Sequence, residues 1–465
     1  MKKVLLLALS DYYWADFTYR LARTLRNDGM DVMIAAESRL GVYQAGLVEQ
    51  FKKEKVYYLS DYIKQRKSNV RNTKISSRIA YPDYIRIGHM CSKCVNEIDW
   101  SASLDILINY VNFVLDEYKP SVIIHEQIST AFSFAFYEES KLRNIEYLGF
   151  LASKLDGRME VGLSFDVAEK KIHDCLNLYL KNKKEISEVD YQWASQFIEN
   201  IKTYVPQYMV NNKLNDYSFR KVVNIDNFRY FIRTLFYCIS TNELHLFRLN
   251  PIKAKYYAFK FNVTRAFKTL FLKKNFDEFD IKKFKGNKVY LYPIHYQPEA
   301  STCVNASNNE RQLDLIEKIA FNLYSDEILL VKEHVSNFGR YSKQDYNRIK
   351  NLPNVFLLAP EENTKEILLY IDFVITLTST VGFEALLLDK KAITFGDIFY
   401  NAHKNSFRAR SVEEMRNFLD DQSMNITDHN YNIKFLLAYK SNTFSGSIRY
   451  GASGLNIIDD IRNML

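Results

Sequence analysis

The segment from Phe373 to Asn401, FVITLTSTVGFEALLLDKKAITFGDIFYN, constrains the fold of this chain most strongly. Its opening, Phe373–Leu377, is apolar and β-branched and predicts a buried strand. Small, hydroxyl-bearing residues follow, then a helix at 384–388 and a second strand at Ala392–Phe395. A strand, a helix and a strand in this order form a βαβ unit. Such a unit requires a parallel sheet with helices on its faces.

The same alternation of strands and helices recurs over two longer stretches of the chain. It runs through residues 1–150 and resumes at Lys288, whereas residues 155–285 are helical, polar and aromatic with weak strand signals. A chain of 465 residues is also too long for one ordinary core. The predicted fold class is therefore α/β, with two Rossmann-like, doubly wound domains and a helical insertion.

This organisation predicts four segments and the strands of two sheets. We expect an N-terminal Rossmann-like domain at 1–154, a helical, basic and aromatic insertion at 155–285, a C-terminal Rossmann-like domain at 286–420, and a helical segment at 421–465 that could cross back to the N-terminal domain. The predicted strands are Val4–Leu9, Asp31–Ala36, Val56–Leu59, Val122–His125, Glu146–Phe150, Val289–Pro293, Glu327–Lys332, Val355–Leu358, Phe373–Leu377 and Ala392–Phe395.

Cysteine content and hydropathy indicate where the protein works. Five Cys, an odd number without regular spacing, favour a reducing compartment and no disulfide framework. No run of about 18 apolar residues occurs, so the sequence predicts no membrane-spanning helix. The opening MKKVLLLALSDYYW is interpreted as a first parallel strand, since no small-residue cleavage site follows it. We expect a cytoplasmic protein, with peripheral contact at the inner face of the membrane left open.

The positive charge of the chain is concentrated in one segment. The net charge is +8, and residues 253–288 alone carry eleven Lys/Arg against three acids. Aromatic residues are interleaved with these cations. The segment could lie on an anionic membrane surface or hold a polyanionic acceptor. The alternative is a solvated helical linker whose aromatic side chains lie in the core.

Polar side chains follow the predicted strands of the C-terminal domain, at the points where ligands of open α/β sheets bind. A Lys and a His opposite a helix N-terminus with Ser and Thr would form a phosphate clamp. Lys332 would supply a point charge and His334 a hydrogen bond, while Glu384, expected in the first turn of its helix, could accept from ribose hydroxyls. An ordinary helix cap is the alternative for the Ser/Thr cluster. The candidate binding residues are His295, Gln297, Glu299, Lys332, Glu333, His334, Thr378, Ser379, Thr380, Gly382, Glu384 and Tyr400.

The order of these motifs resembles bacterial capsular polysaccharide biosynthesis glycosyltransferases, with the nearest likeness to the capsule Kdo (3-deoxy-manno-octulosonate) transferases. The motifs are YPIHYQPE ending at Glu299, VKEH ending at His334, STVGFEAL starting at Ser379 and FGDIFY ending at Tyr400. The resemblance covers residues 285–405. It implies a GT-B architecture, in which two Rossmann-like domains enclose a cleft and the C-terminal one binds the nucleotide sugar without a metal.

The sequence departs from the family at two positions. Val335 follows His334 where members usually have Pro, and Glu299 stands near Gln297 where the Kdo members often carry Asp. The donor nucleotide therefore stays open between CMP, UDP and GDP. No cofactor other than this donor substrate is expected.

The acceptor side of such enzymes comes from the N-terminal domain, where three polar residues end predicted strands. An inverting transfer needs a general base near the acceptor hydroxyl, and Glu126, Asp11 or His125 could fill that role. A retaining transfer would depend more on stabilising the leaving phosphate, where His334 could also act. The alternative for Glu126 is an acid that precedes the helix expected from Ser129. The sequence does not choose between the two stereochemical outcomes.

No metal site is predicted. The segment His89-Met-Cys91-Ser-Lys-Cys94 offers at most three ligands, and no second Cys/His pair has zinc-like spacing. Phosphate-loop, dinucleotide-binding and nucleophile-elbow motifs do not occur in the sequence.

These observations predict a glycosyltransferase that moves a sugar from a nucleotide donor to a surface glycan or glycolipid. Two alternatives remain. A sugar-nucleotide epimerase or hydrolase on the same scaffold needs paired carboxylates and an arginine-rich grip, and few Arg follow the predicted strands. A non-catalytic polyanion-binding protein would use the basic segment, but no nucleic-acid-binding motif accompanies it.

Overall fold

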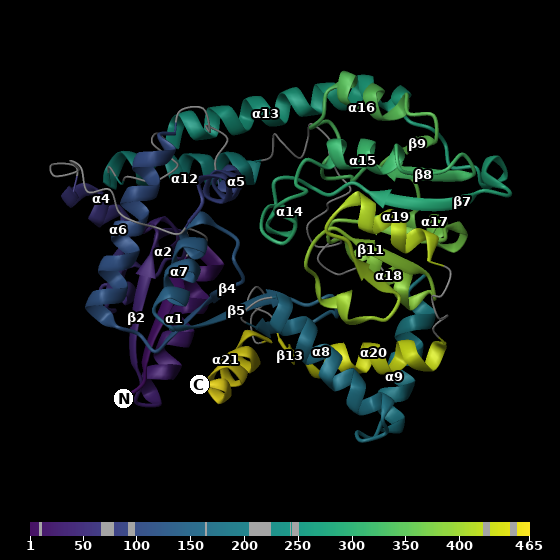
Figure 1. Ribbon diagram of the computed structural model, residues 1–465. Helices are drawn as coiled ribbons and strands as arrows, with labels where there is room; N and C mark the ends of the chain where they lie inside the picture. The colour runs from purple at the N-terminus through teal and green to yellow at the C-terminus, as the bar shows by residue number, and fades with distance from the viewer. Residues whose placement is uncertain are drawn as a thin grey trace. The chain divides into compact units, whose positions relative to one another are not determined.

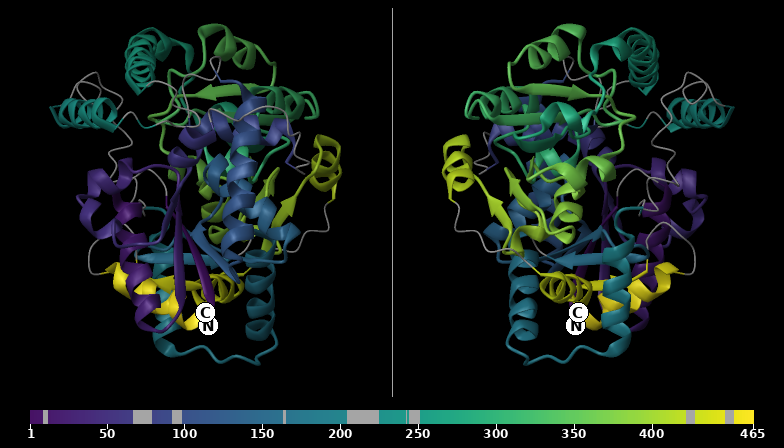
Figure 2. Two further views of the ribbon diagram at one scale, coloured as in Figure 1. Left: turned by 90° about the vertical axis from the view of Figure 1, so that its left-hand side faces the viewer. Right: turned by 90° about the vertical axis from the view of Figure 1, so that its right-hand side faces the viewer.

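The computed structural model of the chain divides into two compact units, each with its own sheet (Figures 1 and 2). Unit 1 comprises Met1–Ser164, Val223–Lys260 and Thr443–Leu465, and unit 2 comprises Phe165–Val222 and Phe261–Asn442. The segment 155–285, expected as one insertion, is thus divided between the units. The structure describes residues 1–8, 12–66, 79–91, 98–162, 165–203, 225–241, 243, 251–421, 428–446 and 453–465.

The sheet of unit 1 has the strand order β13-β6-β5-β4-β1-β2-β3. The strands from β5 to β3 pair in parallel, while β6 and β13 add to the β5 edge in antiparallel fashion. β1 and β2, in purple, lie side by side in Figure 2. The strands are β1 (Lys3–Ala8), β2 (Asp31–Ala36), β3 (Val56–Tyr58), β4 (Val122–Glu126), β5 (Glu146–Ala152), β6 (Arg158–Gly162) and β13 (Thr443–Ser445).

The helices of unit 1 begin and end at residues suited to those positions. α6 is capped by Asp99, whose side chain accepts from the Ala102 amide, and ends at Lys119 in the left-handed conformation. The two ends of the described chain meet in unit 1, where Lys2 Nζ donates to the Leu465 carbonyl at 2.6 Å. The helices are α1 (Tyr12–Asn27), α2 (Leu40–Ala45), α3 (Val48–Phe51), α4 (Leu59–Arg66), α5 (Tyr81–Cys91), α6 (Trp100–Tyr118), α7 (Ala131–Leu142), α12 (Ile225–Thr241) and α21 (Ser453–Met464).

The sheet of unit 2 is wholly parallel, with the order β12-β11-β10-β7-β8-β9. This is the doubly wound order 3-2-1-4-5-6, and it reverses direction between β7 and β10. The strands are β7 (Lys288–Pro293), β8 (Glu327–Lys332), β9 (Val355–Leu358), β10 (Phe373–Thr376), β11 (Lys391–Thr394) and β12 (Ser406–Arg408). Ligands of such sheets bind at the carboxyl ends of the strands where the order reverses.

Both faces of the second sheet are buried, which explains why its strands are continuous apolar runs. Tyr290 and Tyr292 of β7 pack in one core cluster, while Val289 and Leu291, which alternate with them, pack in another.

The helices that belong to this unit are α8 (Phe165–Leu180), α9 (Glu188–Asn200), α14 (Ala300–Cys303), α15 (Gln312–Ala320), α16 (Lys343–Lys350), α17 (Thr364–Tyr370), α18 (Thr380–Leu387), α19 (Val412–Asp420) and α20 (His429–Ser441), with 3₁₀ turns η2 (Lys273–Asn275), η3 (Ile281–Phe284) and η4 (Phe399–Ala402). α8, α9 and α20 pack together (Figure 1). The long helix α13 (Pro251–Leu272) begins in unit 1 and continues in unit 2.

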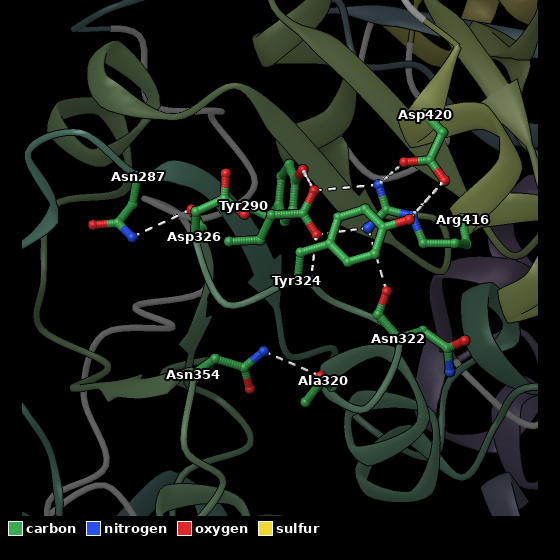
Figure 3. Close-up of polar contacts among 10 residues, drawn as sticks. Asn287, Tyr290, Ala320, Asn322, Tyr324, Asp326, Asn354, Arg416 and Asp420 are labelled. Atoms are coloured by element: carbon green, nitrogen blue, oxygen red, sulfur yellow. Dashed lines mark hydrogen bonds and ion pairs between the residues drawn. The ribbon is translucent and has the colours of Figure 1, made fainter.

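At the amino ends of the strands of unit 2, charged residues neutralise one another. Glu327, at the start of β8, is fully buried and accepts from Arg416 Nη1 at 2.6 Å and from the Tyr290 hydroxyl at 2.7 Å. Arg416 also pairs with Asp420 at 2.6 Å, and Figure 3 shows this pair beside Tyr324. This edge of the sheet is therefore a closed ion-pair network that stabilises the fold.

The predicted α/β class with two Rossmann-like sheets is confirmed. The predicted start of the helix at 384–388 is wrong: this helix begins at Thr380, because Ser379 caps it. In the part of the chain that the structure describes, no helix is long and apolar enough to cross a membrane.

Candidate functional site

His295 lies at the point where the strand order of the second sheet reverses. Its buried ring has Nε2 2.9 Å from Thr376 Oγ1, at the end of β10. The Thr376 hydroxyl accepts from the Ser379 amide at 3.2 Å, which leaves its own proton for Nε2. The neutral ring therefore carries its proton on Nδ1. Burial, with a smaller contribution from His334, lowers the pKa of His295 to about 3, so the ring is neutral at physiological pH.

Thr378, Ser379 and Thr380 form the N-terminus of α18. The Ser379 side chain accepts from the Val381 amide at 3.2 Å, and the Thr378 hydroxyl donates to the Ser301 carbonyl at 2.8 Å. These two hydroxyl groups therefore form hydrogen bonds within the protein that hold the turn in place. The terminus still offers an anion the helix dipole, together with the half-exposed side chains of Ser379 and Thr380.

Lys332 ends β8 and is almost fully buried. Its Nζ donates to the Pro360 carbonyl at 3.1 Å and more weakly to the Glu333 carbonyl at 3.4 Å. An ammonium group has three N–H bonds, so one remains for a ligand. Burial lowers the pKa of Lys332 to about 8, and nearby glutamates oppose the shift. Lys332 is therefore mostly charged at neutral pH and suits a phosphate.

His334 follows Lys332 and is half-buried. Its Nδ1 accepts a hydrogen bond from the Ser336 amide at 3.0 Å, which fixes the proton of the neutral ring on Nε2. Burial lowers the pKa of His334 to about 4, with smaller contributions from Lys332 and Arg265. The side chain is thus a neutral Nε2–H donor at physiological pH. Such a donor suits a phosphate or leaving-group oxygen.

Glu333 stands between these two residues and is fully buried. Its carboxylate accepts from the His334 amide at 2.6 Å, from Asn337 Nδ2 at 3.2 Å and from the Tyr346 hydroxyl. Burial raises its pKa, and these hydrogen bonds oppose the rise. Glu333 thereby fixes the turn that carries His334, which makes it a positioning residue.

Arg265 of α13 brings a cation to the site, a contact that the sequence pattern did not indicate. Its Nε donates to the Phe338 carbonyl at 2.7 Å and its Nη2 to the Val335 carbonyl at 3.2 Å, so it binds the turn after His334. The helix can approach because of Gly339, which has φ +82°. A Cβ there would lie 2.8 Å from a side-chain carbon of Thr269. The sequence places Arg265 in the basic segment but gives no signal for this contact.

Arg340 is a second cation that sequence reasoning missed. It donates to the Gln297 carbonyl and the Tyr296 hydroxyl, each at 2.6 Å, and its guanidinium lies 4.3 Å from the centre of the Tyr296 ring. Burial lowers the pKa of Arg340. Burial lowers that of Arg265 as well, with the Arg340 charge contributing. The edge that carries Lys332 and His334 therefore gains two further cations.

Gln297 and Glu299 line the loop after β7. The Gln297 amide donates to the Glu310 carbonyl, and Glu299 is exposed and accepts from the Ser301 hydroxyl at 2.8 Å. Gln297 thus holds the loop through its side chain, whereas Glu299 remains accessible to solvent.

Gly382 and Tyr400 support the start of α18. Tyr400 is fully buried, and its hydroxyl donates to the Ser379 carbonyl at 2.7 Å. A Cβ at Gly382 would lie 2.5 Å from that hydroxyl, so the glycine provides the space for the ring. Both residues therefore fix the position of Ser379.

Glu384 lies in the second turn of α18, so its predicted place in the first turn is wrong. It is almost fully buried, and its Oε2 pairs with Lys365 Nζ of α17 at 2.5 Å. Burial raises its pKa, and Lys365 opposes the rise. In this structure Glu384 therefore joins α17 to α18.

Two candidates of unit 1, His125 and Glu126, lie at the carboxyl end of β4. His125 is fully buried, with its ring centroid 5.1 Å from that of Trp14, and burial lowers its pKa to about 3. Glu126 is half-buried and accepts from the Ser129 hydroxyl at 3.1 Å. Asp11 lies outside the described residues.

Among the residues that the structure describes, no group of three or more His, Cys, Asp and Glu is placed to hold a metal ion. Cys94 of the His89–Cys94 segment lies outside these residues.

The fold and the carboxyl edge of the second sheet together define the class of protein. It is a two-unit Rossmann-like protein whose second sheet carries cations at its carboxyl end. Residues 239–404 match the family described as "Capsule polysaccharide biosynthesis protein". The match covers about a third of the chain and includes every candidate binding residue. It confirms the family resemblance that the motifs predicted. No curated protein matches the sequence.

Several solved structures are similar to this chain at a low level. The KpsC β-Kdo 2,7 transferase of Thermosulfurimonas dismutans has 12% identity and a TM-score of 0.37, covering 77% of this chain and 89% of that one. The KpsC β-Kdo 2,4 transferase of the same organism has 12% identity and a TM-score of 0.36, covering 74% and 87%. UDP-GlcNAc 2-epimerase from Neisseria meningitidis, bound to UDP-GlcNAc, has 13% identity and a TM-score of 0.25, covering 95% and 98%.

Proposed function

We propose that the protein is a glycosyltransferase that moves a sugar from a nucleotide-sugar donor to a bacterial surface glycan. The observation that carries the proposal is the carboxyl edge of the second sheet. There Lys332 has one N–H left and His334 presents a fixed Nε2–H. This edge lies where doubly wound sheets bind ligands and within the segment that matches the capsule family.

In this proposal the donor phosphates bind between the cations and the N-terminus of α18. As the sugar leaves, negative charge grows on the terminal phosphate oxygen, and Lys332 with His334 would stabilise that charge. Arg265 and Arg340 hold the turn and the loop in place and add positive potential. The proposed enzyme would need no metal, because these groups would neutralise the leaving phosphate. The donor nucleotide is CMP, UDP or GDP.

The acceptor hydroxyl must lose a proton, and we assign that step to unit 1. Of its candidates, His125 is buried and Glu126 is half-buried at the same strand end. Glu126 is therefore our proposed general base for an inverting transfer. The proposed acceptor is a capsular, exopolysaccharide or lipopolysaccharide-type glycan at the cytoplasmic side of the membrane.

The rival activity, a sugar-nucleotide epimerase or hydrolase, would need paired carboxylates. Two buried carboxylates of unit 2, Glu333 and Glu384, are engaged with Tyr346 and Lys365. Arg265 and Arg340 do supply the arginines that seemed to be missing for an epimerase. Since the carboxylates are committed to the fold, the arrangement favours transfer over epimerisation.

The first experiment measures binding of CMP, UDP and GDP to the purified protein by calorimetry. We expect one of them to bind and to raise the melting temperature, because ligand binding stabilises the folded state. Donor sugars carrying that nucleotide are then screened for transfer. If none of the three nucleotides binds, the proposed function is wrong.

A further inference from the structure

Helix α13 has two apolar faces, and only one of them packs against the protein. Residues three or four apart share a face of a helix. One face is buried or half-buried and carries Phe261, Arg265, Thr269 and Leu272. The opposite face carries the α13 stripe: Tyr256, Phe259, Phe267, Leu270 and Phe271, with side chains between 53% and 76% exposed. Figure 1 shows α13 as one unbroken helix.

This exposure contradicts the expectation of a linker with its aromatic side chains in the core. A soluble protein seldom presents so many large apolar groups on one helix face without a partner. Phe271 is 76% exposed. The α13 stripe therefore needs an apolar environment outside the described protein.

The charges around the α13 stripe indicate what that environment is. α13 contains five Lys/Arg and no acid, and Lys273 and Lys274 follow it directly. Lys260 and Lys274 are exposed, and no described acid lies within salt-bridge distance of either. Lys273 pairs with Glu361 at 3.5 Å. A row of exposed aromatic side chains flanked by lysines complements a surface that is apolar below and anionic above.

We propose that the α13 stripe lies in the interface of an anionic lipid bilayer, with α13 parallel to the membrane plane. A dissolved polyanion would use the lysines but not the aromatic side chains. A second copy of this chain would meet the same unpaired lysines and be repelled by them. Only a bilayer with acidic headgroups uses both features at once.

The membrane contact is joined to the candidate site by the helix itself. On the face opposite the α13 stripe, Arg265 holds the turn that follows His334. A docked α13 would therefore keep the donor-binding edge near the bilayer surface. This link to catalysis rests on the proposed function and implies a lipid-linked acceptor. The docking of α13 on the membrane does not depend on the proposed function.

The test is sedimentation of the full chain with vesicles of phosphatidylglycerol and phosphatidylcholine in equal amounts. We expect binding that weakens steeply with salt and is absent from pure phosphatidylcholine. The triple variant Phe267→Ser, Leu270→Ser and Phe271→Ser should lower the partition coefficient by more than about tenfold, because buried apolar side chains supply much of the binding. Lys260→Glu with Lys274→Glu should lower it by roughly tenfold through lost attraction.

Matched controls change similar groups elsewhere on unit 2. Phe321 is 70% exposed and Lys343 is exposed, so Phe321→Ser and Lys343→Glu should leave vesicle binding unchanged. Equal binding by the triple variant and the wild-type protein would overturn the proposal. So would a concentration-dependent dimer that the triple variant abolishes while vesicles are not bound. Nucleotide binding is measured on the same samples, so a failure of docking is distinguished from a failure of the proposed transferase.

Discussion

In each unit a histidine and a glutamate stand at the carboxyl end of one strand, β4 in unit 1 and β8 in unit 2, but the two pairs are used in opposite ways. At the end of β4, His125 is buried against Trp14 and Glu126 is half-buried. After β8, Glu333 is buried under three hydrogen bonds and His334 is half-buried. In each pair one residue is buried in the fold and the other remains accessible to solvent.

The residue that stays accessible determines which chemistry each edge can perform. Unit 1 leaves a carboxylate accessible, which can accept a proton from a hydroxyl. Unit 2 leaves a neutral imidazole next to Lys332, which can donate to an anion. The residue types alone would give both edges the same assignment. Burial decides between them.

The largest expected effect comes from the accessible carboxylate of unit 1. Glu126→Gln keeps the shape of the side chain and its bond to Ser129 but removes the proposed base, so transfer should fall by about 100-fold or more. Donor nucleotide affinity should not change. Glu138→Gln, which alters an acid of α7 that pairs with Lys141, is the matched control. Unchanged turnover in Glu126→Gln would remove this residue from the mechanism.

The buried carboxylate of unit 2 should matter for stability instead. Glu333→Ala leaves the donors of Asn337, Tyr346 and His334 without their acceptor, so the free energy of unfolding should fall by about 3 kcal/mol or more. Glu126→Ala should cost less than about 1 kcal/mol, because its side chain is half in water. Urea unfolding of both variants measures the difference. Similar losses in the two variants would contradict the contrast between the edges.

A smaller effect concerns pH and Lys332. A phosphate binds the charged form of this lysine, whose pKa is lowered to about 8 by burial. Affinity for the nucleotide should therefore fall as the pH rises above 8, by up to about tenfold per pH unit. Calorimetry at several pH values measures the slope, and Lys332→Met should bind weakly with a flatter profile. An identical slope in Lys332→Met would show that another group titrates.

The strands of the fold could be predicted closely because their physical signal is local. Asp31–Ala36, Glu327–Lys332 and Val355–Leu358 match the structure residue for residue, since each is a short apolar run buried on both faces. The polar strand β12 and the three-residue β13 carry no such pattern. α16 was missed although Ser342 and Asp345 form its capping box, a signal that the sequence does contain.

The candidate site could be predicted only in part. Lys332 and His334 follow a recognisable strand, so the topology places them at the carboxyl edge. Arg265 is 70 residues away from Val335, and that contact depends on how α13 packs. The pairing of Glu384 with Lys365 is likewise a tertiary contact. Tertiary packing also determines which residue of a polar pair is buried, and burial in turn determines the role of that residue.

Calorimetric titration of the nucleotide into two histidine variants shows whether the nucleotide binds at the carboxyl edge of the second sheet. His334→Ala, with its fold verified by circular dichroism, should weaken binding by about tenfold or more, because a hydrogen bond to a charged phosphate is lost. His125→Leu, which keeps the buried volume beside Trp14, should bind as the wild-type protein does. Full affinity in His334→Ala, or a loss confined to folded His125→Leu, would contradict the account.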